Sequence, residues 1–214
     1  MKKSLKKKAS GLRRYTNVPA LLHILQNRKL TLLSPATWDD KNDAFFMSQF
    51  KRRQKLESVL ALCFAKAPET YHHWRVFTHG SDGACITFRR EELVAKLSCN
   101  AGIIAQSVKY KLIRELNAFS PAVKDLPFLK RQPYKDEKEF RILYIDAKER
   151  FEAKEFDIDL TSIERVTLSP WMPKSLANAV RQTIHAIPGC DKIKVYQTTL
   201  LENDKWKSSA RGAH

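Results

Sequence analysis

The sequence predicts one domain of the α+β class, with a mixed sheet of roughly six strands and with helices near both ends of the chain. Two fully apolar runs of strand length, Ser58–Ala65 and Gly83–Phe88, predict buried strands. Apolar residues at helical spacing occur early and late. The chain has 214 residues, no internal repeat and no low-complexity linker, so one domain with a sizeable core is expected.

The first helix is predicted to begin after Asn17. Leu21, Leu22 and Leu25 follow at helical spacing, Asn17 is a candidate N-cap, and Pro19 fits the first turn. The next segment, KLTLLSP, predicts a short strand that its proline ends. ATWDDKNDAFF follows and predicts a loop, because it is dense in Asp and Asn.

The middle of the chain alternates between connections and short elements. The segment KAPETYHHWRVFTHGSD is too polar and too aromatic for a core element, so it is predicted as a connection. RREELVAKL predicts a short helix and SVKYKLI a half-buried strand. FSPAVKDLPFLKRQP, which contains three prolines, predicts an irregular basic connection.

Three more strands and a long helix complete the predicted elements. The strands are KEFRILYI, IERVTLS and KIKVYQTTL. The helix, PKSLANAVRQTIHAI, ends at Pro188-Gly189 and carries four apolar residues on one face: Leu176, Val180, Ile184 and Ile187.

The net charge is strongly positive: 39 Lys and Arg residues against 23 Asp and Glu residues give +16 at pH 7. Such an excess favours a polyanionic partner, with nucleic acid ahead of an anionic membrane. Residues 1–11 are predicted as a flexible basic arm that binds phosphates without reading sequence. The candidate phosphate-binding residues are Lys6, Lys7, Lys8, Lys130 and Arg131. The alternative is that the charge only keeps the protein soluble.

Several classes of protein are disfavoured by what the sequence lacks. No apolar run approaches the roughly 20 residues that span a bilayer, and no apolar segment follows the basic head as in a secretory signal. The four cysteines lie far apart without a CxxC pair, which favours free thiols in a reducing cytoplasm over a zinc site or disulfide framework. GxGxxG, GKS/T, HExxH and GxSxG motifs are absent, which disfavours dinucleotide oxidoreductases, P-loop enzymes, zinc proteases and serine hydrolases.

The segment YKDEKEFRILYID alternates charged and apolar residues. As a strand it presents two sets of side chains to opposite faces, with Phe140, Ile142 and Tyr144 toward the core and with Glu137, Glu139 and Arg141 away from it. Two carboxylates and a guanidinium at such spacing shift one another's pKa. On periodicity alone, a solvated ladder contributing about 0–1 kcal/mol per ion pair is favoured over the wall of an active site.

Several segments resemble, in order, the motifs of one bacterial family. LRRYTN and LLHILQNRKLTLLSPATWDDKNDAF resemble its Arg-Tyr start, short helix, Ser-Pro strand end and Asn/Asp loop. LCFAKAPETYHHWRVFTHGSDGACITF resembles its Cys-Phe-Ser strand, Trp-centred segment and Gly-Val-Cys-Ile strand, and YKDEKEFRILY its Glu-Lys-Glu-(Trp/Phe)-Arg strand. The set resembles the family catalogued as domain of unknown function 2971. The layout of that family is similar to the ADP-ribosyltransferase fold, which includes DNA- and RNA-modifying toxins of phage defence.

This resemblance implies a mixed, split sheet flanked by helices in a domain over residues 12–201, followed by a C-terminal tail at 202–214. It also implies NAD as a substrate, nucleic acid as the acceptor, and an antitoxin as a possible neutralising partner. In a transfer from NAD, the bond to nicotinamide breaks through an oxocarbenium-like state. Glu139 is the candidate that stabilises this cation and binds the ribose 2′-hydroxyl, and Glu137 is the candidate that orients or deprotonates the nucleophile.

The resemblance further implies a set of NAD-binding residues: Arg14, Tyr15, Asn42, Asp43, Trp74 and Arg141. Arg14 would hold the pyrophosphate bidentately. Trp74, with Tyr71 near it, would stack on nicotinamide or on a base. Plainer interpretations stay open: Arg14 in the basic arm, Asn42 and Asp43 in a turn, and Trp74 in the core.

The chain departs from the family pattern in two places. The segment DKNDA at 40–44 lacks the expected proline, and HHWRVFTHG replaces Met-Trp-x-x-Tyr; either change would alter specificity or remove activity. Two alternatives to a transferase therefore stay open. One is a non-catalytic nucleic-acid-binding module of the same fold. The other is a nuclease that holds magnesium with Glu137, Glu139 and Asp43.

Overall fold

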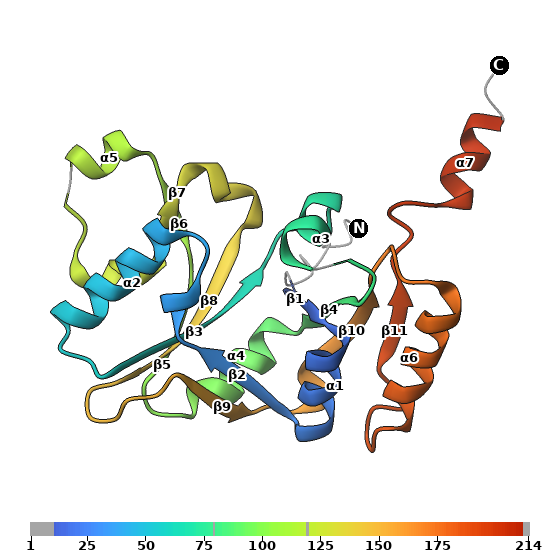
Figure 1. The fold of residues 1–214 in the computed structure, drawn as a ribbon, viewed down its shortest axis with the longest axis horizontal. Coiled ribbons are helices and arrows are strands. Elements are labelled where there is room, and N and C mark those ends of the chain that lie inside the picture. The colour runs from blue at the N-terminus through green and yellow to red at the C-terminus, as the bar shows by residue number, and fades with distance from the viewer. Residues whose placement is uncertain (1–10, 79, 119, 212–214) are drawn as a thin grey trace, which may run out of the picture.

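The computed structural model describes residues 11–78, 80–118 and 120–211, and a mixed β-sheet forms its centre (Figure 1). Among these residues nine strands build the sheet in the order β11-β10-β4-β1-β3-β2-β9, with β8 and then β5 on the far edge of β3. The strands are β1 (Leu12–Asn17), β2 (Lys29–Leu33), β3 (Ser58–Ala65), β4 (Gly83–Phe88), β5 (Ile103–Ser107), β8 (Glu139–Asp146), β9 (Ala153–Asp157), β10 (Ile163–Leu168) and β11 (Lys194–Gln197). A separate parallel pair joins β6 (Lys109–Lys111) and β7 (Leu129–Arg131).

The sheet is split along one edge of β3. The opposite edge of β3 pairs with β8 over its whole length, ending at the pair Ala65–Glu139. The split edge is shared, because β2 meets it at Ala61 and β1 meets it at Ala65. Among the described strands, none therefore pairs with residues 62–64 of β3 on that edge. This geometry agrees with the predicted split sheet.

Helices cover both faces of the sheet (Figure 1). They are α1 (Val18–Asn27), α2 (Lys41–Arg53), α3 (Tyr71–Phe77), α4 (Arg90–Ser98), α5 (Ile113–Ala118), α6 (Lys174–Ala186) and α7 (Asp204–Arg211), with the 3-10 helices η1 (Pro35–Thr37), η2 (Val123–Phe128), η3 (Gln132–Glu137) and η4 (Leu160–Ser162). α1, α4 and α6 pack in the larger core with Phe140 and Ile142 of β8. α2 and η2 pack on the other face, against Leu143. The predicted α+β class with a mixed sheet flanked by helices is thus confirmed.

Several elements form as the sequence predicts. β3 and β4 have the predicted bounds, since each is a continuous apolar run that the sheet buries. α1 begins after Asn17, whose side chain accepts a hydrogen bond from the backbone N–H of Ala20, and Pro19 lies in its first turn. Leu21 and Leu25 of α1 are fully buried. None of the described helices is long and apolar enough to cross a membrane.

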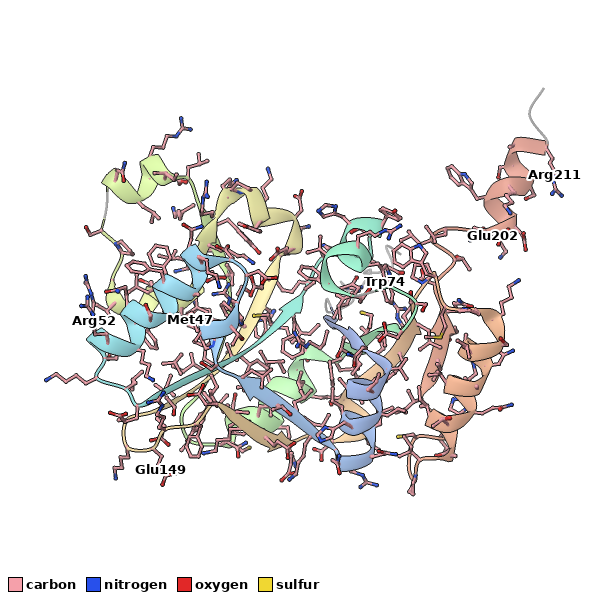
Figure 2. All side chains as sticks on the ribbon, viewed as in Figure 1. Met47, Arg52, Trp74, Glu149, Glu202 and Arg211 are labelled. Carbon is pink, nitrogen blue, oxygen red and sulfur yellow. The ribbon has the colours of Figure 1, made fainter. Side chains whose placement is uncertain are left out.

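The loop predicted over residues 36–46 is wrong, because α2 begins within it. Asp40 caps this helix by accepting hydrogen bonds from the backbone N–H groups of Asn42 and Asp43. Asp40 is therefore a helix-capping residue. Asp43, Met47 and Phe50 share a buried face at helical spacing (Met47 is labelled in Figure 2). Because Asp43 is a charged residue in this buried face, the helical spacing of the face cannot be recognised from apolar residues alone.

The connection predicted over residues 66–82 is also partly wrong. α3 forms there, capped by Thr70, and it buries His73 and Trp74 (Trp74 is labelled in Figure 2). The strand predicted over 107–113 is instead the end of β5 followed by β6. β9 was not predicted, and the described residues contain more strands than the roughly six expected. Leu176 of α6 is 55% exposed, whereas Ala177 and Ile184 are buried. α7 extends away from the rest of the fold, within the predicted C-terminal tail (Figure 1).

Candidate active site

A cavity of about 560 Å³ lies at the split in the sheet. This volume is within the usual range for small-molecule sites, about 300–1,000 Å³. β1, β3, η1, the start of α2, the end of α3, β7, η3 and the start of β8 contribute to its lining. Its ionisable lining residues are Arg13, Arg14, Tyr15, Asp39, Asp40, Asp43, Cys63, Lys130, Glu137 and Glu139. The lining therefore combines several carboxylates with cations from β1 and β7.

Arg141 holds two of these carboxylates from behind the cavity. Its Nη1 donates to Asp43 Oδ1 at 2.8 Å, its Nη2 donates to Asp43 Oδ2, and its Nε donates to Glu139 Oε1 at 2.6 Å. Nη1 also donates to the Pro127 carbonyl at 2.8 Å. The side chain is fully buried, so these bonds supply what water would otherwise provide. Arg141 is not part of the lining itself.

Lys130 joins the two glutamates at the lining. Its Nζ donates to Glu137 Oε2 at 2.8 Å and to Glu139 Oε2 at 3.0 Å. Glu137 is the last residue of η3 and Glu139 is the first residue of β8, with Lys138 between them in a left-handed conformation. That turn brings both carboxylates to one ammonium group.

The two glutamates differ in their pKa values. Burial alone would raise the pKa of Glu139, but the Arg141 guanidinium and the Lys130 ammonium outweigh it and lower this pKa to about 2. Burial raises the pKa of Glu137, and Lys130 offsets this only in part. Burial likewise raises the pKa of Asp43. Glu139 is therefore held ionised, whereas Glu137 is the more ready of the two to take up a proton.

Arg14 lies at the split edge of β3. Its Nη1 donates to the Cys63 carbonyl at 3.3 Å, an acceptor in the part of that edge that has no partner strand. Burial lowers the pKa of Arg14, although a guanidinium stays charged at neutral pH. Arg13 next to it donates from Nη1 to the Ala67 carbonyl at 2.8 Å. Two guanidinium groups thus lie at the β1 side of the cavity.

Trp74 is a core side chain that does not line the cavity. It is fully buried, and its Nε1 donates to Glu69 Oε1 at 2.7 Å. Its ring meets the Tyr15 ring edge to face, with 5.3 Å between centroids. Tyr15 does line the cavity, and Phe77 lies 5.7 Å from it. Trp74 therefore supports the wall that Tyr15 forms, as the core interpretation predicts.

The structure brings some of the predicted site residues together and separates others. The predicted residues that share the lining are Arg14, Tyr15, Asp43, Lys130, Glu137 and Glu139. The predicted residues of the described chain that are outside it are Asn42, Trp74, Arg131 and Arg141. Lys6, Lys7 and Lys8, with most of the predicted arm, lie outside the described residues.

The solvated ion-pair ladder favoured by periodicity is wrong. Glu139 and Arg141 are 4% and 0% exposed, because α2 and η2 cover their face of β8. Glu137 is not in the strand at all; η3 contains it. Phe140, as predicted, faces the larger core.

Three residues at the site were not predicted as functional. Tyr110 of β6 accepts a hydrogen bond through its hydroxyl from the Glu139 backbone N–H at 2.7 Å. Cys63 hydrogen-bonds Glu139, and burial raises the pKa of its thiol. Asp40 caps α2 with one carboxylate oxygen and presents a second, buried oxygen without a hydrogen-bond partner among the described residues. Only Asp40 had a sequence signal, in the Asp- and Asn-rich segment.

Comparison with solved structures shows that the fold of this chain is similar to that of known proteins. No family model matches the chain, and no curated protein matches it significantly, so the resemblance to domain of unknown function 2971 is not confirmed. Among solved structures, DarT from Thermus sp. 2.9 in complex with NAD+ is 11% identical, with a TM-score of 0.47 over 92% of this chain and 98% of that one. The same protein in complex with ADP-ribosylated ssDNA is 11% identical, with a TM-score of 0.48 over 92% of this chain and 97% of that one. Thermosipho africanus DarTG in complex with ADP-ribose is 11% identical, with a TM-score of 0.40 over 89% of this chain and 50% of that one. At this identity the likeness concerns the fold alone.

Proposed function

We propose that the chain is an NAD-dependent ADP-ribosyltransferase that modifies nucleic acid. The observation that carries this proposal is the pair Glu137 and Glu139, joined by Lys130 at a cavity whose β1 side presents Arg14. Glu139 is held ionised, whereas the pKa of Glu137 is raised. A group transfer that separates charge and moves a proton needs one carboxylate of each kind.

Glu139 is proposed to stabilise the positive charge that develops on the ribose. The bond from C1′ to the nicotinamide nitrogen breaks, and its electron pair leaves with neutral nicotinamide. The cation left at C1′ is stabilised by a nearby fixed carboxylate, because such charges act strongly in a site that excludes water. Arg141 holds this carboxylate in place through two donors, so it serves as a positioning residue.

Glu137 is proposed to accept the proton of the incoming nucleophile. A lone pair on the acceptor forms the new bond to C1′, and the proton displaced from the acceptor passes to the Glu137 carboxylate. Its raised pKa suits this role better than the low pKa of Glu139 does. Arg14 is proposed to bind the pyrophosphate, since guanidinium and phosphate geometries match.

Nucleic acid is proposed as the acceptor because of the +16 net charge. Single strands are the natural probes, since a nucleotide that reacts in a cavity must leave the base stack. Both DNA and RNA are tested, and a DarT structure in complex with ADP-ribosylated ssDNA makes DNA the first choice of probe. The defence role and the neutralising partner stay predictions of the resemblance.

The geometry favours a transferase over the magnesium nuclease. Lys130 and Arg141 already bond the carboxylates of Glu137, Glu139 and Asp43 that a magnesium ion would need. In the part of the chain that the structure describes, no group of three or more His, Cys, Asp and Glu side chains could hold a metal ion. The non-catalytic binding module is distinguished from the transferase by experiment.

The test incubates the full chain with NAD labelled in its ADP-ribose part and a short single-stranded DNA or RNA. Label is expected on one of these strands, with nicotinamide released. Glu139→Gln should abolish both signals, whereas Glu57→Gln, which changes an exposed glutamate, should keep them. If neither nicotinamide release nor label transfer occurs with the wild-type chain, the binding module is the better account.

A further inference from the structure

Three cations gather beside the cavity without being part of its lining: Lys66, Arg90 and Lys138. Lys66 directly follows β3, and Lys138 directly precedes β8. Arg90 is the first residue of α4. We call these three residues the cation cluster. They lie where the end of β3 meets the start of β8, at the pair Ala65–Glu139.

Contacts with neighbouring elements hold the cluster in place. The Lys66 Nζ donates to Ser107 Oγ of β5 at 2.7 Å, and its backbone N–H donates to the Lys138 carbonyl at 3.1 Å. The Arg90 guanidinium carbon lies 4.8 Å from the centre of the Phe140 ring. These contacts fix the Lys66 and Arg90 side chains and the Lys138 backbone, while Arg90 and Lys138 stay exposed.

The charge of the cluster is not balanced. Within residues 11–78, 80–118 and 120–211, none of the three cations forms an ion pair with a carboxylate, whereas Lys29, Lys96 and Lys109 on other surfaces each do. Partial burial lowers the pKa of Lys66, and the positive charges of Arg90 and Lys138 lower it further. Like charges held together in this way favour a bound anion, because an anion relieves their repulsion.

The cluster is next to the proposed catalytic group. Lys138 and Glu139 are consecutive, so their Cα atoms are about 3.8 Å apart. Ala65 and Glu139 both line the cavity, and Lys66 and Lys138 are their direct neighbours in sequence. Side chains alternate along β8, so Lys66 and Arg90 lie on the face that carries Phe140, and the Glu139 carboxylate lies on the other face. An anion at the cluster would therefore be separated from a substrate in the cavity by the ends of β3 and β8, and a strand would have to pass around these ends to reach both.

We propose that Lys66, Arg90 and Lys138 bind a backbone phosphate of the single-stranded nucleic acid whose neighbouring nucleotide enters the cavity. This inference rests on the proposed function and assigns a subsite to its acceptor. The NAD pyrophosphate has its own candidates in Arg13 and Arg14, which do line the cavity. The cluster is outside the cavity lining and can therefore bind a phosphate that does not enter the cavity. A nucleic-acid strand supplies such a phosphate next to every nucleotide.

The test compares two double variants of the full chain that each remove two positive charges. Arg90→Gln/Lys138→Gln changes the two exposed cluster members, and Lys192→Gln/Lys194→Gln changes two exposed lysines near β11. Binding of a short fluorescent single-stranded DNA, and of the matching RNA, is measured by anisotropy without NAD over a series of salt concentrations. A far-ultraviolet spectrum and a melting curve confirm that both variants fold.

The cluster variant should bind the strand more weakly and with a flatter salt dependence. The slope of log K against log salt should lose about 0.7, since the cluster contacts one phosphate and each phosphate contact to a single strand contributes about 0.7. The control variant should keep the wild-type slope. Whether DNA or RNA shows the effect tells which strand the site takes.

Three results would overturn the subsite: equal slopes in the two variants, no binding of either strand by the wild-type chain, or weaker binding of NAD in the cluster variant. The last result would assign the cluster to the dinucleotide. Release of nicotinamide without any oligonucleotide reports on the proposed function separately, because the cluster variant should keep it at the wild-type rate. Loss of that activity in Glu139→Gln alone leaves the subsite to be judged by the strand-binding slopes.

Discussion

Two groups of charges lie at the start of β8, on its two faces, and differ in pairing and in exposure. In the first, Arg141 and Lys130 are bonded to carboxylates that face them, and all are largely buried. In the second, the cation cluster, the cations have no facing carboxylate among the described residues, and Arg90 and Lys138 are exposed. Paired buried charges fix a geometry, whereas unpaired exposed charges keep their capacity to bind. The difference suggests that the first group orients a reaction and the second receives a ligand.

The largest expected effect is that of removing Arg141. Arg141→Met leaves Asp43 and Glu139 buried without their cation, so the free energy of unfolding should fall by about 3–5 kcal/mol. Urea unfolding followed by fluorescence measures it. Arg150→Met, at a side chain that is 75% exposed, should stay within about 0.5 kcal/mol of wild type. A small loss for Arg141→Met would show that the buried network does not hold the site together.

The next effect is a loss of stability in acid. Because the pKa of Glu139 is lowered from 4.5 to about 2, its ion pairs stabilise the fold above pH 4.5, and this contribution of about 3 kcal/mol is lost as pH falls toward 2. The raised pKa values of Glu137 and Asp43 act in the opposite direction and reduce the net loss. Unfolding free energies measured over this pH range should show a flatter dependence for Glu139→Gln than for wild type. Identical pH dependence in both would contradict the ionised, paired state of Glu139.

A smaller effect is expected at Tyr110. Tyr110→Phe removes the hydroxyl that accepts from the Glu139 N–H and leaves that buried donor unpaired, so stability should fall by about 1–3 kcal/mol. Tyr134→Phe keeps the ring over Lys130 and is the matched control, with a change within about 0.5 kcal/mol. Equal values for the two variants would mean that the Tyr110 hydroxyl does not support β8.

The smallest effect on stability belongs to the cation cluster. Arg90→Gln/Lys138→Gln breaks no ion pair among the described residues, so the free energy of unfolding should change by no more than about 0.5 kcal/mol. The pKa of Lys66 should rise toward its ordinary value, because two neighbouring positive charges are gone. Titration of the Lys66 ammonium by NMR measures this. A large loss of stability would place the cluster with the structural group rather than with the binding group.

The elements that depend on local pattern could be predicted from the sequence. β3 and β4 are continuous apolar runs, and the bounds predicted for them hold. The start of α1 follows from Asn17 and Pro19, since capping and the first helical turn are decided by neighbouring residues. These predictions needed no knowledge of distant segments.

The environment of the charged strand could not be predicted in this way. The alternation of Glu139 and Arg141 with apolar residues is the same for a solvated ladder and for a buried network. What decides between them is the cover provided by α2, and Asp43 on that helix is 98 residues from Arg141. Because the sequence predicts a loop where α2 forms, it leaves a turn open as the alternative for Asp43 and does not predict the burial of this carboxylate against Arg141. Periodicity reports that a strand has two faces but not what covers each face.

The resemblance contributed the grouping of residues that periodicity could not supply. Arg14, Asp43 and Glu139 are far apart in the chain, yet they line one cavity. Trp74 was grouped with them by its place in an aromatic segment, but it packs in the core behind Tyr15. An aromatic side chain in a polar segment suits either position, so sequence alone did not separate the two.

Release of nicotinamide by wild type and by Glu139→Gln tests the central claim most directly. With labelled NAD and a single-stranded acceptor, wild type should release nicotinamide and label the strand. The folded Glu139→Gln variant should do both at least about 100-fold more slowly, the usual order of loss when a fixed group that stabilises transition-state charge is removed. Equal rates for the folded variant and wild type would contradict the assignment of Glu139 as the catalytic carboxylate.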